Sequence, residues 1–84
     1  MESNTASSLF PATKIIIEVF KTNVTDVAVA ASIQDALLNA LPACKINFDL
    51  QDCDRILRIE GKVVQLELVK IIVSSSGHFC EPLM

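Results

Sequence analysis

The sequence predicts an α+β domain in which a four-stranded antiparallel sheet carries two helices on one face, in βαββαβ order. Three observations predict it. The 84 residues are enough for one domain. About half of them, 51%, are hydrophobic, which is enough for a core between a sheet and a helical layer. Segments with the two-residue period of strands alternate in this order with segments of helical period, and right-handed crossovers place both helices on the same face.

The domain is expected to span residues 13–84, preceded by a polar, serine-rich tail over residues 1–12 that we predict to be disordered. The net charge of −3 argues against binding to nucleic acid or to an anionic membrane surface, since both require a basic face. No apolar run approaches the roughly 18 residues that span a bilayer. The first residues lack the pattern of a signal peptide, so we expect a cytoplasmic protein.

The first strand and helix are predicted from residue type and capping. Residues 14–20 are mostly β-branched or aromatic and have apolar side chains on both faces, which indicates a central strand. Asp26 is a suitable N-cap, because its carboxylate can accept the free amide hydrogens of a first helical turn. A helix is expected over residues 27–41, ended by Pro42.

A hairpin follows the first helix. Residues 44–51 alternate between apolar and polar, residues 52–54 form a turn, and residues 55–60 form the return strand, closed by Gly61. If the turn is centred on residues 52 and 53, it sets the pairing of the two strands. That register predicts three opposite pairs: Phe48 with Leu57, Ile46 with Ile59 and, on the outer face, Lys45 with Glu60.

The last third of the chain is open to two interpretations. Residues 64–68 alternate like a strand, whereas Leu66, Val69, Ile72 and Val73 form a helical stripe. The length of the segment 63–75 favours a helix, and Gly77 lies where a helix C-terminal glycine is expected. A short strand over residues 79–83 completes the order, and Pro82 assigns it to an edge of the sheet.

Four features stand out in the resulting ferredoxin-like arrangement between about Lys14 and Leu83. They are a first loop ending in Thr25, a helix with Val29, Ile33 and Leu37 in register, a hairpin over residues 46–61, and Ser76-Gly77 before a short last strand. In these features the chain resembles the heavy-metal-associated domain family, which is found in copper chaperones and metal-pumping ATPases and has a hairpin of matching length and pattern.

This chain departs from that family in the loop that binds the metal. The family pattern is Gly-Met-Thr-Cys-x-x-Cys, and residues 23–29 lie there in this sequence. Thr25 matches, but the two cysteines are replaced by Asp26 and Val29. Copper(I) requires soft thiolate ligands, so the resemblance implies a divergent member without tight copper(I) or zinc binding through this loop.

An alternative metal site uses Asp26 and His78, because His78 lies where the family places a residue near the metal loop. Together with Asn23 and Thr25, these side chains could ligate a harder divalent ion. The competing interpretation is a helix cap and a surface histidine. Cys44, Cys53 and Cys80 lack zinc-site spacing and are expected to be reduced thiols, with Cys53 a poor nucleophile between two acidic residues.

Neither catalysis nor a cofactor is expected, since the chain has no nucleophile–base signature and no phosphate loop. RNA recognition needs aromatics on the open sheet face, where we expect Ile16, Glu18 and Ile56 among charged residues. Apolar residues outside the core stripe of the second helix are Val64, Leu68 and Ile71. We therefore expect a homodimer or a protein partner. A small-molecule regulatory module is a third hypothesis, supported by fold analogy alone.

Overall fold

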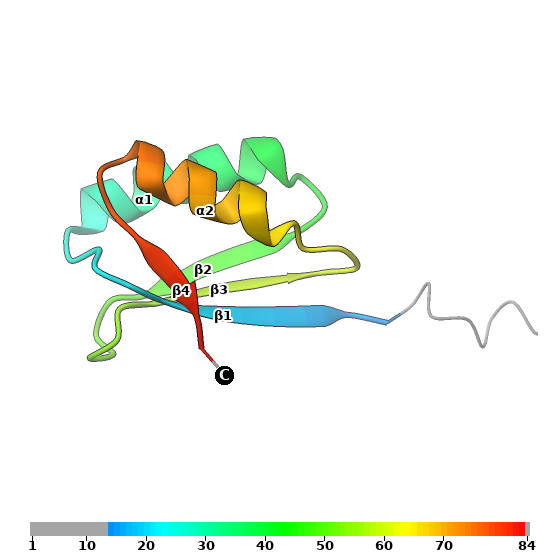
Figure 1. Cartoon of the computed structure of the whole chain (residues 1–84), viewed down its shortest axis with the longest axis horizontal. Helices are drawn as coiled ribbons and strands as arrows, with labels where there is room; N and C mark the ends of the chain where they lie inside the picture. Colours follow the sequence, from blue (N-terminus) through cyan, green and yellow to red (C-terminus); the bar gives the residue numbers. More distant parts are fainter. Residues whose placement is uncertain (1–13, 84) are drawn as a thin grey trace, which may run out of the picture.

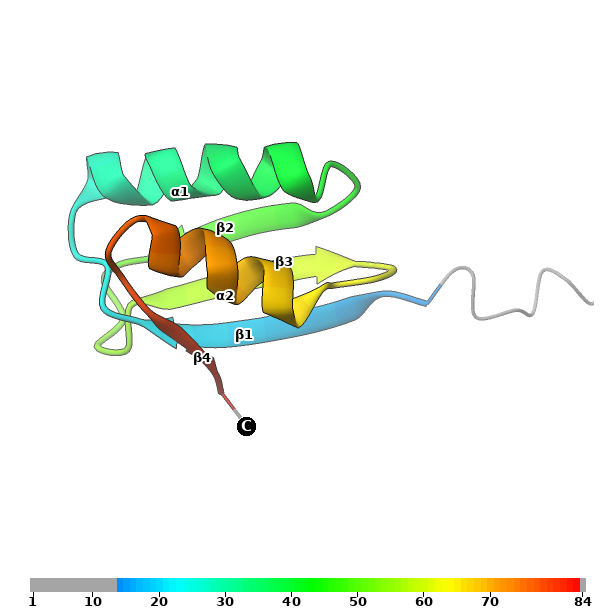
Figure 2. The same ribbon diagram turned by 45° about the horizontal axis from the view of Figure 1, so that its top comes forward.

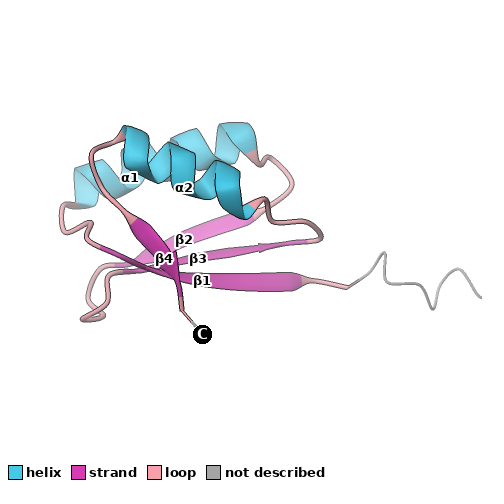
Figure 3. Ribbon diagram, in the orientation of Figure 1, coloured by secondary structure: helices cyan, strands magenta, loops and turns pink. Residues whose placement is uncertain are grey.

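The computed structural model describes residues 14–83, so the expected tail over residues 1–12 lies outside the described residues. Six elements follow one another in the predicted order (Figure 1): β1 (Ile16–Thr22), α1 (Val27–Ala40), β2 (Lys45–Asp49), β3 (Ile56–Gly61), α2 (Leu66–Ser75) and β4 (Cys80–Pro82). The four strands form one sheet in the order β2-β3-β1-β4, with antiparallel pairing throughout. Both helices lie on the same face of this sheet (Figure 3).

This architecture confirms the predicted α+β fold of ferredoxin-like order. β1 is a central strand, flanked by β3 and β4, and Pro82 lies in an edge strand as expected. The hairpin register is also confirmed, with Phe48 opposite Leu57 and Lys45 opposite Glu60. In the described part of the chain, neither helix has the length and apolar character that crossing a membrane requires.

Capping residues mark the start of α1 and the end of α2. Asp26 caps α1, because its Oδ1 accepts hydrogen bonds from the amides of Ala28 at 2.7 Å and Val29 at 3.3 Å. α2 begins at Leu66, three residues later than predicted, which resolves the ambiguous segment in favour of a helix. Gly77 follows the end of α2 with a φ of +82°, a left-handed conformation that suits glycine.

The core lies between the sheet and the two helices. Its fully buried side chains come from every layer: Phe20, Val24, Leu37, Leu57, Ile59, Val69 and Val73. Phe20 is opposite Leu57, so these two residues fix which faces of β1 and β3 meet the helices.

The faces of β1 differ from the sequence-based expectation. Ile17 lies opposite Glu60 and Val19 opposite the exposed Arg58, so Ile17 and Val19 point to the open face of the sheet. Ile16 and Glu18 share the helix-facing side with Phe20, and their predicted place on the open face was wrong. Both faces of this strand are apolar in sequence, and the burial of Phe20 under the helices decides between them.

The exposed apolar surface of α2 is also smaller than predicted. Val64 and Leu68 are half-buried and pack against the core. Only Ile71 of the predicted set is well exposed, at 59%. The apolar surface available for contact therefore lies mainly on the sheet rather than on this helix.

Candidate functional site

The loop after β1 lies beside the segment that precedes β4. Asn23 makes the connection, since its side-chain Oδ1 accepts a hydrogen bond from the backbone amide of Phe79 at 3.0 Å. His78 is adjacent in sequence, and its Nδ1 lies 3.0 Å from the carbonyl oxygen of Ser76. The neighbourhood expected between the first loop and the segment around His78 is therefore present.

The polar groups of this loop already have partners within the protein. One carboxylate oxygen of Asp26 caps α1, and the side-chain oxygen of Asn23 is bonded to Phe79. Among residues 14–83, neither Asp26 nor His78 belongs to a group of three or more metal-ligating side chains with ligand atoms within 4.8 Å of one another. Asp26 acts as a helix cap, and His78 contacts Ser76 in its own loop.

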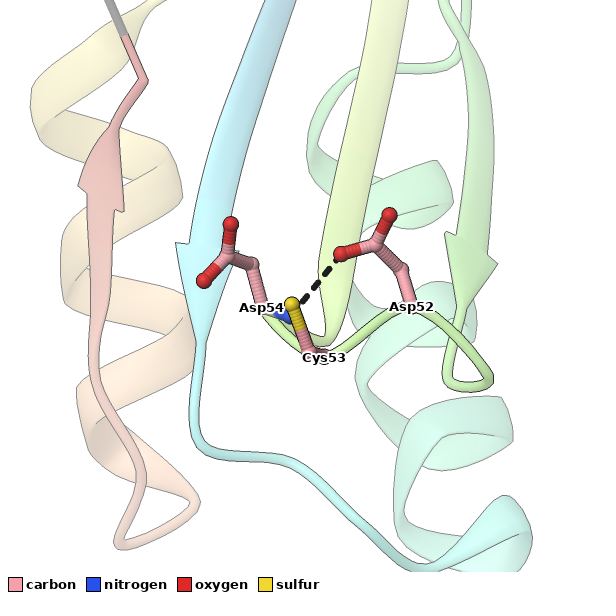
Figure 4. A group of neighbouring side chains, drawn as sticks. All are labelled: Asp52, Cys53 and Asp54. Carbon is pink, nitrogen blue, oxygen red and sulfur yellow. Dashed lines mark hydrogen bonds between the residues drawn. The ribbon is translucent and has the colours of Figure 1, made fainter.

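The one such group in the described chain lies in the turn between β2 and β3, at Asp52, Cys53 and Asp54. In Figure 4 the sulfur of Cys53 lies between the two carboxylates, and Asp52 Oδ1 accepts a hydrogen bond from the amide of Asp54 at 2.8 Å. The first two residues are exposed and Asp54 is half-buried. The three are consecutive, so their closeness is a property of the turn that the sequence predicted.

Thr22 holds this turn against the end of β1, a function that the sequence analysis missed. Its buried Oγ1 donates a hydrogen bond to the carbonyl of Arg55 at 2.6 Å and accepts one from the amide of Val24 at 3.1 Å. Its own amide donates to the carbonyl of Asp54 at 3.0 Å. Arg55 has a φ of +48°, so this network stabilises a left-handed residue.

The three cysteines lie in different environments. Cys44 is buried just before β2, Cys53 is exposed, and Cys80 is half-buried in β4. β2 and β4 are opposite edges of the sheet, so Cys44 and Cys80 lie apart. Burial raises the pKa of the Cys80 thiol above its ordinary value of 9.0, and the positive charge of Lys70 opposes this increase in part.

The open face of the sheet has an apolar half and a polar half. The apolar half, called here the open-face strip, consists of Ile15, Ile17, Val19, Ile56 and Leu83. Ile15 is 53% exposed, Ile17 49% and Leu83 42%. Toward β2 the face becomes polar, and Arg58 forms an ion pair with Glu60 at 3.4 Å.

This arrangement is suited to contact with an apolar surface. The strip offers adjacent aliphatic side chains, and Ile17, Val19 and Ile56 line a shallow depression together with Arg58. The signal in the sequence was the run of isoleucines over residues 15–17, of which Ile16 was predicted on the open face. The structure instead places Ile17 there. Compared with known proteins, the chain matches no family model, no curated protein and no solved structure.

Proposed function

We propose that this chain is a non-catalytic cytoplasmic domain, similar to heavy-metal-associated domains without their thiolate site, that acts through protein–protein contact or homodimerisation. The observation that carries the proposal is the open-face strip. Its aliphatic side chains lie next to one another on a sheet face that neither α1 nor α2 covers. Adjacent exposed aliphatic residues beside a polar region have the layout of an interface core with a polar rim.

The residues of the first loop support the proposal that the thiolate metal site has been lost. Asp26 and Val29 lie where the family pattern has its two cysteines. Asp26 caps α1, and Val29 is half-buried against the core. Both positions thus serve the fold, and neither offers the soft sulfur ligand that copper(I) prefers.

Native mass spectrometry of the reduced full chain tests the proposal, alone and with copper(I), zinc and nickel. We expect self-association that increases with protein concentration and no metal adduct that survives dilution. Replacing Ile56→Lys places a charge in the open-face strip and should weaken the association. Lys62→Glu, at an exposed position outside the strip, is the control and should leave it unchanged.

The alternative function, divergent metal binding or trafficking, predicts the reverse. A stoichiometric adduct on a monomeric protein would contradict the contact proposal. Loss of that adduct in Asp26→Ala with His78→Ala would then assign it to the first loop, whereas loss in Cys53→Ser would assign it to the β2–β3 turn. A metal-free protein that stays monomeric at millimolar concentration would contradict the homodimer form of the proposal.

A further inference from the structure

β4 covers only the C-terminal half of β1. Its pairing with β1 runs over Phe20–Thr22, and the last contact is the hydrogen bond from the amide of Leu83 to the carbonyl of Val19 at 2.8 Å. β1 continues for three more residues toward its N-terminus, to Ile16. Figure 2 shows β4 beside the C-terminal end of β1 only. Among residues 14–83, no strand pairs with β1 on this side before Val19.

The direction of the backbone groups follows from the contact at Val19. Its carbonyl points toward β4, and along a strand the backbone groups of every second residue point the same way. The N–H and C=O groups of Ile17 and Ile15 therefore point to the uncovered side, while those of Ile16 and Glu18 point toward β3. An uncovered strand edge of this kind is a template for another strand.

We infer that this edge binds the same edge of a second copy of the chain, with the two β1 strands antiparallel about a twofold axis at Ile16. Ile15 of each copy then lies opposite Ile17 of the other. Each of these pairs exchanges both backbone hydrogen bonds, so the N–H and C=O groups of Ile15 and Ile17 in each copy are used. This inference rests on the proposed function, because it names the partner and the surface of that contact.

The backbone hydrogen bonds favour a twofold axis at Ile16 over an axis at Ile15 or Ile17. An axis at Ile17 would place Val19 opposite Ile15, but the carbonyl of Val19 already accepts the hydrogen bond from Leu83. An axis at Ile15 would pair Ile17 with a residue before Lys14 and leave Glu18 without a charged partner from the described strand. The axis at Ile16 uses the uncovered groups of Ile15 and Ile17 and no others.

The charges of the strand favour a second copy over an unrelated partner. Lys14 and Glu18 lie equally far on either side of Ile16 and carry opposite charges. The twofold axis therefore places Lys14 of each copy opposite Glu18 of the other. These are non-hydrogen-bonded pairs, in which facing side chains are closest, so two favourable ion pairs form.

The side chains agree with this arrangement. Ile15 and Ile17, among the most exposed aliphatic residues, contact each other across the axis on the open face and extend the open-face strip into the second copy. Ile16, 37% exposed, meets its own counterpart on the other face. The paired segment is short, so the interface is small and the dimer should be weak and dependent on concentration.

Charge reversal tests the register. Sedimentation velocity on the full chain at micromolar to millimolar concentration should show a reversible dimer. Glu18→Lys and Lys14→Glu should each weaken it at least tenfold, because each variant places like charges opposite one another. Mixing the two variants should restore association as a heterodimer, since one strand then carries two acids and the other two bases. Asp35→Lys on the exposed side of α1 changes the net charge as much as Glu18→Lys and should have no effect.

Amide hydrogen exchange provides a second measurement that does not depend on how the charge variants fold. The amides of Ile15 and Ile17 should become protected as protein concentration rises, whereas that of Leu38 on exposed α1 should not change. A monomer at every concentration would overturn the inference. A dimer that ignores both charge reversals but is lost in Ile56→Lys would also overturn it, while leaving the proposed contact function in place.

Discussion

The two halves of β1 have the same kind of sequence and opposite environments. Val19–Thr22 is bonded on both sides: to β3 and the turn before it on one side, and to β4 and Leu83 on the other. It contains Phe20 and Thr22, which are buried. Among residues 14–83, the first half, Ile16–Glu18, pairs with β3 only. Its two isoleucines and Ile15 just before it are exposed. β-branched residues form strands in both halves, so strand propensity does not cause the difference.

The cause lies in the neighbouring strand. β4 spans only Cys80–Pro82 and cannot reach the first half of β1. The second half of β1 therefore joins β3 to β4, while the first half leaves backbone and aliphatic groups exposed. The comparison shows that an uncovered strand edge arises where a short edge strand lies beside a longer strand.

Truncating one large side chain in each half should give the greatest contrast. Phe20→Ala removes a fully buried ring and should reduce the free energy of unfolding by about 3–5 kcal/mol. Ile17→Ala removes a side chain that is 49% exposed and should cost less than about 1 kcal/mol. Urea denaturation at a protein concentration below that at which sedimentation detects association measures both. Equal losses would show that the uncovered half is as tightly packed as the other.

Gly61 of β3 lies opposite Ile16 of β1. Substitutions at Gly61 therefore test how β3 holds the uncovered half of β1. A Cβ at this position would lie 2.6 Å from the Sγ of Cys44. Gly61→Ala should therefore destabilise the fold by about 1–3 kcal/mol. Adding Cys44→Ala removes the sulfur and should recover part of that loss, as measured in a double-mutant cycle.

Gly77 provides the matched control for this cycle. Its φ is +82° and a Cβ there would meet open space, so Gly77→Ala costs conformational energy without a contact. Cys44→Ala should not recover that loss. Recovery at both glycines, or at neither, would contradict a direct contact between Gly61 and Cys44.

Thr22 tests the anchoring of the covered half. Thr22→Val keeps the shape but removes the hydroxyl that bonds Arg55 and Val24, leaving a buried amide unpaired. We expect a loss of about 1–3 kcal/mol in unfolding free energy. Thr25→Val, at an exposed position in the next loop, is the control and should change little. Equal losses in unfolding free energy for Thr22→Val and Thr25→Val would mean that the Thr22 hydrogen bonds do not stabilise this half of β1.

Much of the fold could be predicted from the sequence because the turn and capping residues indicate the same element boundaries as the hydrophobic periodicity. The turn over residues 52–54 fixed the hairpin register, since a slip of one residue would turn every apolar side chain of the strand outward. Asp26 and Gly77 marked helix ends through capping groups that depend on neighbouring residues only. Local chemistry was sufficient at these positions.

The surface that we propose for contact depends on distant residues. Both faces of β1 are apolar, and only the packing of Phe20 beneath two helices shows which face is open. The uncovered edge depends on where β4 ends relative to β1, a relation between residues about sixty positions apart. The metal hypothesis for Asp26 and His78 came from a resemblance, and the contacts found there are those of a cap and a loop.

The smallest expected effect concerns β4, the strand that separates the two halves of β1. Cys80 lies opposite Thr22, and burial raises the pKa of its thiol above the ordinary value of 9.0. Well below pH 9.0 both folded and unfolded states hold the proton, so this thiol gives stability no pH dependence there. Above that value the unfolded state loses the proton first, and the free energy of unfolding should fall as pH rises.

Urea denaturation of the wild type, Cys80→Ser and Cys53→Ser on both sides of pH 9.0 isolates this contribution from the titration of lysines. The fall should be smaller in Cys80→Ser and unchanged in Cys53→Ser, whose side chain is exposed. Hydrogen exchange should locate the change, because loosening β4 exposes the amide of Lys21 and extends the uncovered edge toward the end of β1. Identical pH dependence in all three proteins would mean that the Cys80 thiol does not couple β4 to the sheet.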